Sequence, residues 1–386
     1  MGRQIIRAAR VDGGLTDILA EDGIIREVRP DLNAEDARVY DAAGRIVIPG
    51  FVDCHLHLDK SHLVERTPYA EGTGAEKGAR TRLEKAAFTV EDITERAERV
   101  IRQAIRTGTA VLRTNVDVDA IVGLKGMEAL LALRERYRGV LTIQVAAFSQ
   151  EGIFSDGQTP QLLEEALRMG ADLVGGHTIT GGEGARHIDF ILDLARRYGV
   201  PADFHLDESG ERKDYLLPYL AQRVRALELE GRVNGIHMCT LAGLSDEERR
   251  EALGLLLEAG LTATVAPTAI STRCIAPVKE LLEAGIPVGL GSDNVRDLFN
   301  PLGSGDIKPI ALLLAYLQRF YADRDVGRLW NMITAGGAQV LGVEYGIRPG
   351  GSADFTVLDA QTPGEVLANQ TQPVWIMRGG RVLELN

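Results

Sequence analysis

The chain has 386 residues, of which 45% are hydrophobic and 25% charged, as is ordinary for a soluble globular protein. Its net charge of −12 argues against nucleic-acid binding, and no apolar run approaches the ~18 residues of a membrane span. The start of the chain shows no secretory signal, and Cys54, Cys239 and Cys274 form no CxxC pair. We therefore expect a cytoplasmic protein with reduced thiols and with neither a nucleic-acid nor a membrane partner.

Both ends of the chain show the pattern of short β-strands. Residues 4–48 include TDILAEDGIIREV, in which Asp22 and Gly23 separate alternating apolar positions and predict a hairpin. Near the other end, ADFTVLDA and VWIMRGGRVLEL indicate further strands, with a Gly-Gly turn inside the second segment. We therefore expect β structure at both ends.

Between about residues 50 and 340, apolar strands alternate with amphipathic helices. Helices are expected at 89–108 and 245–260, the latter with a capping box of Ser245 and Glu248 and a stop at Gly260. Eight segments have strand character: 50–58, 110–118, 141–148, 172–179, 202–208, 234–240, 262–270 and 286–295. This alternation predicts the α/β class and a parallel sheet closed into a (β/α)₈ TIM barrel. An open, doubly wound sheet is the alternative, but the strand count favours the barrel.

Polar residues gather at the C-terminal ends of these strands, where the active sites of barrels lie. In GFVDCHLHLDKSH, His55 and His57 are one residue apart, so they project from one face of the strand while Cys54 projects from the other. Three later strands add polar residues at their ends: His205 and Glu208, His237, and Asp293.

Taken singly, each of these histidines is more typical of a hydrogen-bonded core residue than of a metal ligand. Four of the seven histidines fall at strand ends, however, and together with Asp293 they favour a metal site. Imidazole nitrogens and one carboxylate suit Zn²⁺ or Fe²⁺ and leave a position open for water. Because side chains alternate along a strand, His205 and Glu208 can share a face only if the strand ends or bends between them.

Several catalytic motifs are absent from the sequence. It contains no HExxH, GxSxG, Walker A or strand–helix GxGxxG motif, which argues against protease, serine-hydrolase and nucleotide-cofactor functions. The HxE and PCxxC signature of the cytidine and adenine deaminases is missing as well.

The combination of motifs resembles the amidohydrolase superfamily, whose barrels carry HxH on strand one, histidines on strands five and six, and aspartate on strand eight. The likeness is strongest to bacterial cytosine deaminases and spans nearly the whole chain, through HLHLD, VAAFSQEGI, LLEEALRMGADLVGG, FHLDE, IH and SDNVRDLFNPLG. It implies a small β domain built from residues 1–49 and 344–386, beside a barrel of residues 50–343.

The resemblance also implies a single divalent ion, Zn²⁺ or Fe²⁺, with four ligands: His55, His57, His205 and Asp293. A second metal is not expected, because segment 172–179 lacks the bridging lysine of many relatives, and His177 there is expected to be structural or to line the pocket. By the same resemblance, His237 would orient the attacking hydroxide and Asp293 would accept its proton. Glu208 would pass a proton to the ring nitrogen of the substrate.

Other residues match positions that contact the substrate in these relatives. Gln150 would read the amide edge of a ring, Phe299 would stack on the ring, and Asn294 lies where relatives read the base. For Lys60 we expect a surface ion pair with Asp59 in preference to a place in the pocket.

Three departures from cytosine deaminases bear on the substrate. The chain reads Ser292-Asp293-Asn294 where they typically read His-Asp-Asp, has Asn115 where relatives often carry histidine, and has HLDK in place of a threonine-containing version. We therefore expect a deaminase of a small nitrogen heterocycle, with a cytosine-like pyrimidine as the first choice.

Several alternatives to a cytosine-like substrate stay open. They are removal of an amine from an s-triazine such as N-isopropylammelide, deamination of isoguanine or a creatinine-type ring, and ring opening of a cyclic amide. A non-catalytic barrel is the least favoured. Because relatives are commonly homo-oligomers, we expect a homo-oligomer.

Overall fold

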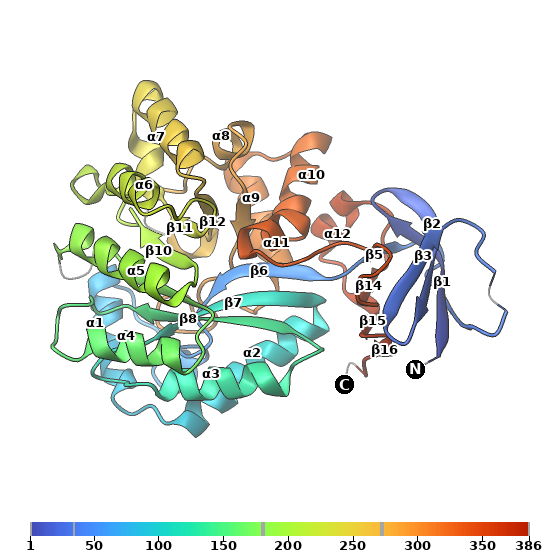
Figure 1. Cartoon of the computed structure of the whole chain (residues 1–386), viewed down its shortest axis with the longest axis horizontal. Coiled ribbons are helices and arrows are strands. Elements are labelled where there is room, and N and C mark those ends of the chain that lie inside the picture. The colour runs from blue at the N-terminus through green and yellow to red at the C-terminus, as the bar shows by residue number, and fades with distance from the viewer. Residues whose placement is uncertain (1, 34, 179–181, 271–273, 385–386) are drawn as a thin grey trace.

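The structure is a computed structural model that describes residues 2–33, 35–178, 182–270 and 274–384. A barrel of strands surrounded by helices forms one part, and a separate sheet that holds both chain ends lies beside it (Figure 1). No helix within these described ranges is long and apolar enough to cross a membrane.

The barrel contains eight parallel strands that pair in chain order. They are β6 (Phe51–Leu56), β7 (Thr109–Asp117), β8 (Thr142–Ser149), β9 (Leu173–His177), β10 (Ala202–Leu206), β11 (Val233–His237), β12 (Thr262–Val265) and β13 (Val288–Leu290). A doubly wound sheet would reverse its strand order at a switch point, and this sheet does not. The predicted α/β barrel is therefore confirmed.

Strands β6 and β13 close the barrel at their C-terminal ends. The amide of His57 donates to the carbonyl of Asp293 at 3.0 Å, and the amide of Asp293 donates to the carbonyl of His55 at 2.8 Å. Close approach of the two strands requires glycine, because a Cβ at Gly291 would lie 2.7 Å from the Cβ of His55. The residues that close the sheet are thus the predicted ligands themselves.

Several strands end earlier than the sequence predicts. The residues that follow β10, β11 and β13 include Asp207, Met238 and Asp293, with φ of 52°, 47° and 57°. Such left-handed conformations break the extended backbone, and apolar alternation does not reveal them. The expected strand 262–270 stops at Val265, and Pro267–Ile270 forms a 3₁₀ turn, η5. The predicted end of the fourth strand, residue 179, lies outside the described residues.

Helices surround the barrel strands (Figure 1). Their bounds are α1 (Gly74–Lys85), α2 (Val90–Arg106), α3 (Lys125–Arg136), α4 (Thr159–Arg168), α5 (Gly184–Tyr198), α6 (Leu217–Ala226), α7 (Asp246–Glu258), α8 (Val278–Glu283), α9 (Ile307–Gln318), α10 (Asp323–Met332) and α11 (Ala335–Leu341). Short 3₁₀ turns lie at η1 (Leu63–Glu65), η3 (Arg212–Asp214) and η4 (Cys239–Gly243). The predicted capping box of α7 is confirmed, since Ser245 and Glu248 bond reciprocally.

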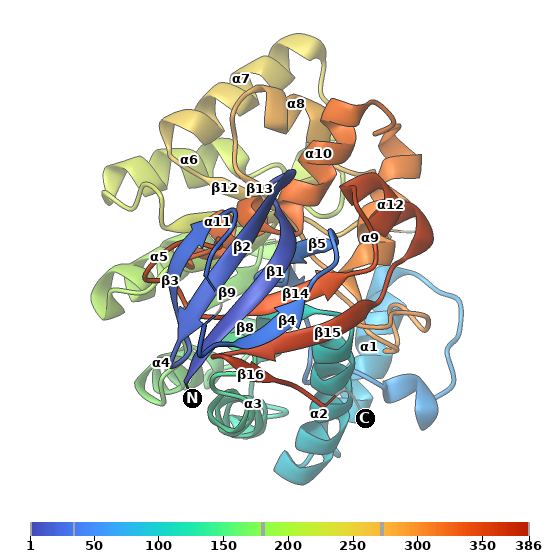
Figure 2. The same cartoon turned by 90° about the vertical axis from the view of Figure 1, so that its right-hand side faces the viewer.

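The second sheet joins both ends of the chain. Its strands are β1 (Arg3–Val11), β2 (Gly14–Glu21), β3 (Ile24–Arg29), β4 (Arg38–Asp41), β5 (Ile46–Ile48), β14 (Phe355–Leu358), β15 (Pro373–Arg378) and β16 (Arg381–Val382). The order is β16-β15-β14-β5-β1-β2-β3, with β4 beside β1, and Figure 2 shows strands from both ends of the chain in this one sheet. The predicted hairpin at Asp22 and Gly23 is confirmed, with positive φ at both residues.

This sheet has a hydrophobic core of its own, which includes Ile6, Val47 and Phe355. A further helix, α12 (Pro363–Asn369), lies between β14 and β15 and contacts α9 and α10 of the barrel. The composite β part predicted from the two chain ends is therefore confirmed. Its division from the barrel after residue 49 and before residue 344 stays a prediction.

Candidate metal centre

Four histidines and one aspartate converge at the C-terminal end of the barrel. Their nitrogen and oxygen atoms form two groups, each with all atoms within 4.8 Å of one another: His55, His57 and His205, and His55, His237 and Asp293. All five side chains are buried, with at most 4% exposed. The structure therefore brings together the five residues that the sequence singled out.

Asn115 on β7 orients the two histidines of β6. The Nδ1 atoms of His55 and His57 lie 3.2 Å from the Asn115 side-chain oxygen and 3.0 Å from its backbone oxygen. Because these oxygens only accept, each Nδ1 carries the hydrogen, and each Nε2 keeps its lone pair. Both Nε2 atoms face Asp293 Oδ1, at 3.2 and 3.4 Å.

The imidazoles have hydrogen-bonding capacity that the described residues leave unused. His55 Nε2, His237 Nδ1 and both ring nitrogens of His205 are buried without a hydrogen-bond partner there. An unsatisfied buried polar atom costs about 1–3 kcal/mol, so four beside one carboxylate need an explanation. A divalent cation fits this donor set, because imidazole and carboxylate ligands suit such ions.

The electrostatics of the site also favour a cation. Burial lowers the pKa of His57 and His237 to about 4 and holds that of His205 well below its usual value, so these rings are neutral at pH 7. Burial alone would raise the pKa of Asp293, but its histidine neighbours, His55 foremost, hold it well below its ordinary range. Burial alone would lower the pKa of His55 as well, but Asp293 outweighs it and raises that pKa. Three neutral imidazoles and an ionised carboxylate are thus in the state in which such residues ligate metals.

Glu208 joins the site through the turn that ends β10. Asp207 has a φ of 52°, and its carboxylate accepts hydrogen bonds from the amides of Leu216 and Leu217 at 2.7 and 3.2 Å. The predicted break between His205 and Glu208 is therefore confirmed. It brings the Glu208 carboxylate to the pocket that His205 lines.

One pocket is lined by four of the five residues, all but His55, and has an empty volume of about 370 Å³. It is lined by His57, Lys60, Gln150, His205, Glu208, His237, Asp293, Asn294 and Phe299. The three residues that the sequence suggested for substrate contact, Gln150, Asn294 and Phe299, therefore face the same space as the metal cluster.

The expectation for Lys60 is wrong. Its side chain is 1% exposed, and its ammonium donates to Asp117 Oδ1 at 2.8 Å, while an oxygen of Asp59 accepts from the Asp117 amide. Lys60 also lines the pocket. Asp117, 57 residues further on at the end of β7, outcompetes Asp59 as the partner because the sheet brings the two strand ends together.

Other contacts in the site were not anticipated from the sequence. The ring of Phe148 lies 4.3 Å from that of His205, and His177 Nε2 lies 2.6 Å from Glu208 Oε2. Ser292 donates from its amide and hydroxyl to Asp53, which ties β13 to β6. Their positions at strand ends are the only signal that the sequence carries for them.

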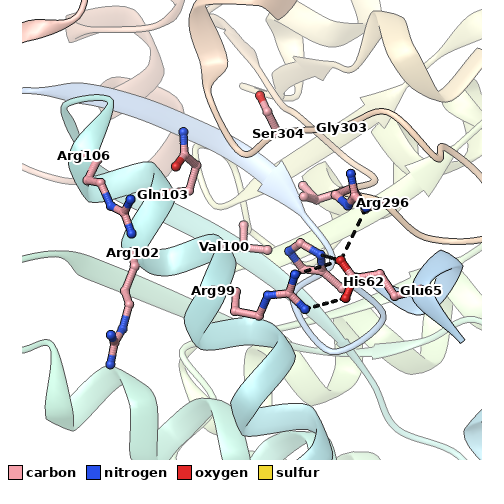
Figure 3. Close-up of a pocket in the computed structure, with 11 residues that line it drawn as sticks. His62, Glu65, Arg99, Val100, Arg102, Gln103, Arg106, Arg296, Gly303 and Ser304 are labelled. Atoms are coloured by element: carbon pink, nitrogen blue, oxygen red, sulfur yellow. Dashed lines mark hydrogen bonds and ion pairs between the residues drawn. The ribbon is translucent and has the colours of Figure 1, made fainter. Parts of the chain in front are cut away.

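A second, larger cavity lies between α2 and the segment after β13. Its lining includes Arg99, Arg106 and Arg296, and its empty volume is about 1090 Å³ (Figure 3). Arg99 makes two bonds to Glu65, at 2.6 and 2.7 Å. None of the five clustered residues lines this cavity, so size alone does not identify the reactive site.

Fold and site together define a metal-dependent hydrolase built on a parallel barrel. The model of the amidohydrolase family matches residues 38–382. The chain belongs to the amidohydrolase family, which makes it a hydrolase of carbon–nitrogen bonds other than peptide bonds.

Relatives support the predicted branch. N-isopropylammelide isopropyl amidohydrolase of Pseudomonas sp. (strain ADP) is 36% identical over 355 residues, 89% of this chain and 87% of the relative. The crystal structure of N-isopropylammelide isopropylaminohydrolase from Burkholderia multivorans ATCC 17616 matches with a TM-score of 0.91 and 32% identity, over 99% of this chain and 98% of that one. The crystal structure of 5-methylcytosine deaminase from Klebsiella pneumoniae with bound 5-fluorocytosine matches with a TM-score of 0.92 and 30% identity. This match covers 99% of this chain and 97% of that one. The resemblance to cytosine deaminases is therefore confirmed at the level of the family branch.

Proposed function

We propose that the protein is a hydrolytic deaminase that acts on an amidine carbon of a small nitrogen heterocycle and releases ammonia. A cytosine-like pyrimidine is the leading substrate. The observation that carries the proposal is the convergence of the buried cluster and Glu208 on one pocket, which Gln150, Asn294 and Phe299 also line. The similarity to 5-methylcytosine deaminase supports it.

Four residues would hold one divalent ion, Zn²⁺ or Fe²⁺: His55, His57, His205 and Asp293. When bound, the ion supplies hydroxide at neutral pH, because it lowers the pKa of water toward ~7. β9 offers no lysine to bridge a second ion, which supports a single one.

The protein's own residues move the protons. Asp293 accepts the proton that the attacking water gives up, and His237, with Nε2 3.9 Å from Asp293 Oδ2, orients the water. The water oxygen bonds to the amidine carbon while Glu208 passes the water's other proton to the adjacent ring nitrogen. The exocyclic carbon–nitrogen bond then breaks, the leaving amine takes up the proton held by Asp293, and an oxo group remains on the ring.

The pocket lining suits a ring that carries an oxo group. Lys60 has three N–H donors and gives one to Asp117. Asn294 donates its amide group to Asp297 Oδ2 at 2.7 Å, which leaves its side-chain oxygen to accept from a ring N–H. With the amide of Gln150 and the ring of Phe299 added, the pocket offers donors, an acceptor and a stacking surface.

A second candidate is the removal of an alkylamine from an s-triazine of the N-isopropylammelide type. It is favoured by the 36% identical relative and by the buried ammonium of Lys60, which suits an electron-rich oxotriazine. Deamination of isoguanine or of a creatinine-type ring, and ring opening of a cyclic amide, remain further alternatives.

A panel of substrates tests these proposals. The metal-loaded protein is incubated with cytosine, 5-methylcytosine, isoguanine, creatinine and N-isopropylammelide, and ammonia and isopropylamine are measured together with metal content. Ammonia from a pyrimidine supports the first candidate, and isopropylamine supports the second. Neither amine in the presence of one equivalent of metal overturns both.

Glu208→Gln is the matched variant for this panel, since it keeps the shape of the side chain. It should retain its metal and lose turnover by ~10²-fold or more, the usual contribution of general acid–base catalysis. Unchanged turnover would remove Glu208 from the mechanism.

A further inference from the structure

A second histidine contacts the proposed proton shuttle. His177 ends β9, and its Nε2 lies 2.6 Å from Oε2 of Glu208, which follows β10. Both residues are nearly buried, with 6% and 9% exposed. A carboxylate can only accept, so the imidazole donates, and a hydrogen bond to a charged acceptor at this length belongs to the strong class.

The fold holds His177 in place from two sides. On β10, His205 is its partner in the parallel register, and the two rings lie 5.7 Å apart. On α5, the Nδ1–H group of His187 donates to the carbonyl of His177 at 3.2 Å. The amide and hydroxyl of Thr178 both donate to the carbonyl of His205. The imidazole of His177 is therefore anchored through its backbone to the barrel and to a helix.

Glu208 itself stands on a less constrained segment. It follows Asp207, which leaves the strand with a left-handed φ of 52°, so no sheet pairing fixes its backbone. The bond from His177 to Oε2 therefore holds one end of this carboxylate on a segment that the sheet does not fix.

We propose that His177 is a positioning residue, which fixes the Glu208 carboxylate in the rotamer that transfers the proton. The inference rests on the proposed function, because it assumes that Glu208 is the shuttle. Misplacement of a catalytic group by about 1 Å can cost ~10²-fold in rate, so loss of the donor should affect turnover more than binding.

Two substitutions of His177 distinguish the effect of its N–H donor from the effect of the size of its side chain. His177→Leu fills the space without a donor, and we expect kcat to fall ~10- to 10²-fold with KM within about twofold and with normal metal content. His177→Gln places an amide N–H near the position of Nε2 and should restore most of the rate. Asn234→Ala, a change at a buried residue whose side chain bonds Asp203 and touches neither His177 nor Glu208, serves as the control and should leave kcat within about threefold.

A double variant tests whether His177 acts through Glu208. In a Glu208→Gln background, His177→Leu should cause no further loss of kcat, because the group that it positions no longer transfers a proton. Losses that multiply would overturn the inference and assign His177 an independent role.

A readout that does not depend on turnover comes from the metal-free protein. The Nε2–H proton of His177 should give a strongly downfield NMR signal in the wild type, which is lost in His177→Leu and moves in Glu208→Gln. A signal that is unaffected by Glu208→Gln would overturn the contact.

The two proposals fail in different ways. An active wild type whose kcat is unchanged in His177→Leu overturns the positioning role and leaves the deaminase proposal standing. A wild type that releases no amine from any compound of the panel overturns both.

Discussion

Two clusters of buried ionisable residues lie side by side at the C-terminal end of the barrel. One is the metal cluster of His55, His57, His205, His237 and Asp293. The other, here called the lysine cluster, contains Asp59, Lys60, Lys85, Asp117, Asp119 and Glu151. The first leaves several ring nitrogens without hydrogen-bond partners within the described chain, whereas in the second both lysines form ion pairs with carboxylates.

The difference shows what marks a ligand site. In the lysine cluster, Lys85 contacts Asp117, Asp119 and Glu151. Burial alone would lower the pKa of Lys85, but these carboxylates outweigh it and raise the pKa, so the charge is already compensated. In the metal cluster, converging lone pairs face one carboxylate. Burial of charge alone therefore does not indicate a metal; unsatisfied donors that point to one place do.

The largest expected effect comes from removing a histidine of the metal cluster. His205→Ala should lose most of its metal and reduce turnover by ~10³-fold or more, because the ion contributes several kcal/mol to the transition state. The metal-free variant should lose stability only through the cavity that the ring leaves beside Phe148, since this imidazole has no hydrogen-bond partner among the described residues. Metal analysis and urea unfolding measure both effects. A variant that retains full metal content would contradict the ligand role.

Lys85→Met removes one member of the lysine cluster, and we expect it to lower stability while leaving metal binding unchanged, the reverse of His205→Ala. Removing one partner of a buried ion pair leaves uncompensated charge, so we expect the free energy of unfolding to fall by about 3–5 kcal/mol. Metal content of the folded protein should stay at the wild-type level. Loss of metal with unchanged stability would erase the distinction between the clusters.

A smaller effect should follow from removing the residue that orients two histidines. Asn115→Ala deletes the side-chain oxygen that accepts from His55 Nδ1 and should weaken metal affinity by ~10- to 10²-fold, as is typical of such supporting residues. Asn234→Ala is the control, because Asn234 is a buried asparagine that bonds Asp203 and no histidine of the cluster. Equal affinities in both variants would show that Asn115 has no supporting role.

The smallest expected effect is on how the free energy of unfolding depends on pH, which His237 and Asp59 should influence in opposite directions. Burial lowers the pKa of His237 to about 4, so between about pH 4 and 6.5 the unfolded chain binds more protons at this residue than the folded one. This residue's contribution to stability is therefore present above pH 6.5 and is lost as the pH falls toward 4. Burial raises the pKa of Asp59 to about 6, so Asp59 favours the folded state as the pH falls through 6.

The free energy of unfolding of the metal-free protein, measured at several pH values, tests the direction of these two contributions. His237→Asn should reduce the dependence of stability on pH between 4 and 6.5 by at most about 1.4 kcal/mol per pH unit. Asp59→Asn should change it in the opposite direction. Identical slopes in the wild type and both variants would contradict the assignment.

The sequence predicts the barrel and the metal cluster for one physical reason. The alternation of apolar and polar residues along a strand can be recognised from neighbouring residues alone, so the sequence shows where each strand ends. The HxH pair and the single histidines of the other strands all lie near such ends, which predicts that they meet. Eight strands are enough to close the sheet. Gly289 and Gly291 allow the last strand to approach the first, because a Cβ at either position would collide with Cys54 or His55.

What the sequence misses depends on contacts between strands. The partner of Lys60 is Asp117 because β6 and β7 are neighbours, and nothing within the HLDK segment favours it over Asp59. The left-handed turns at Asp207 and Asp293 occur at residues other than glycine, so the strands were expected to run too far. The contact between His177 and Glu208 likewise needs the register of β9 and β10.

The central claim is tested most directly by a crystal structure of the protein grown with Zn²⁺, with the metal located by anomalous scattering. The account predicts one peak, with His55, His57, His205 and Asp293 at ~2.0–2.2 Å from it. A peak elsewhere, or none within reach of His205 in fully loaded protein, would contradict it.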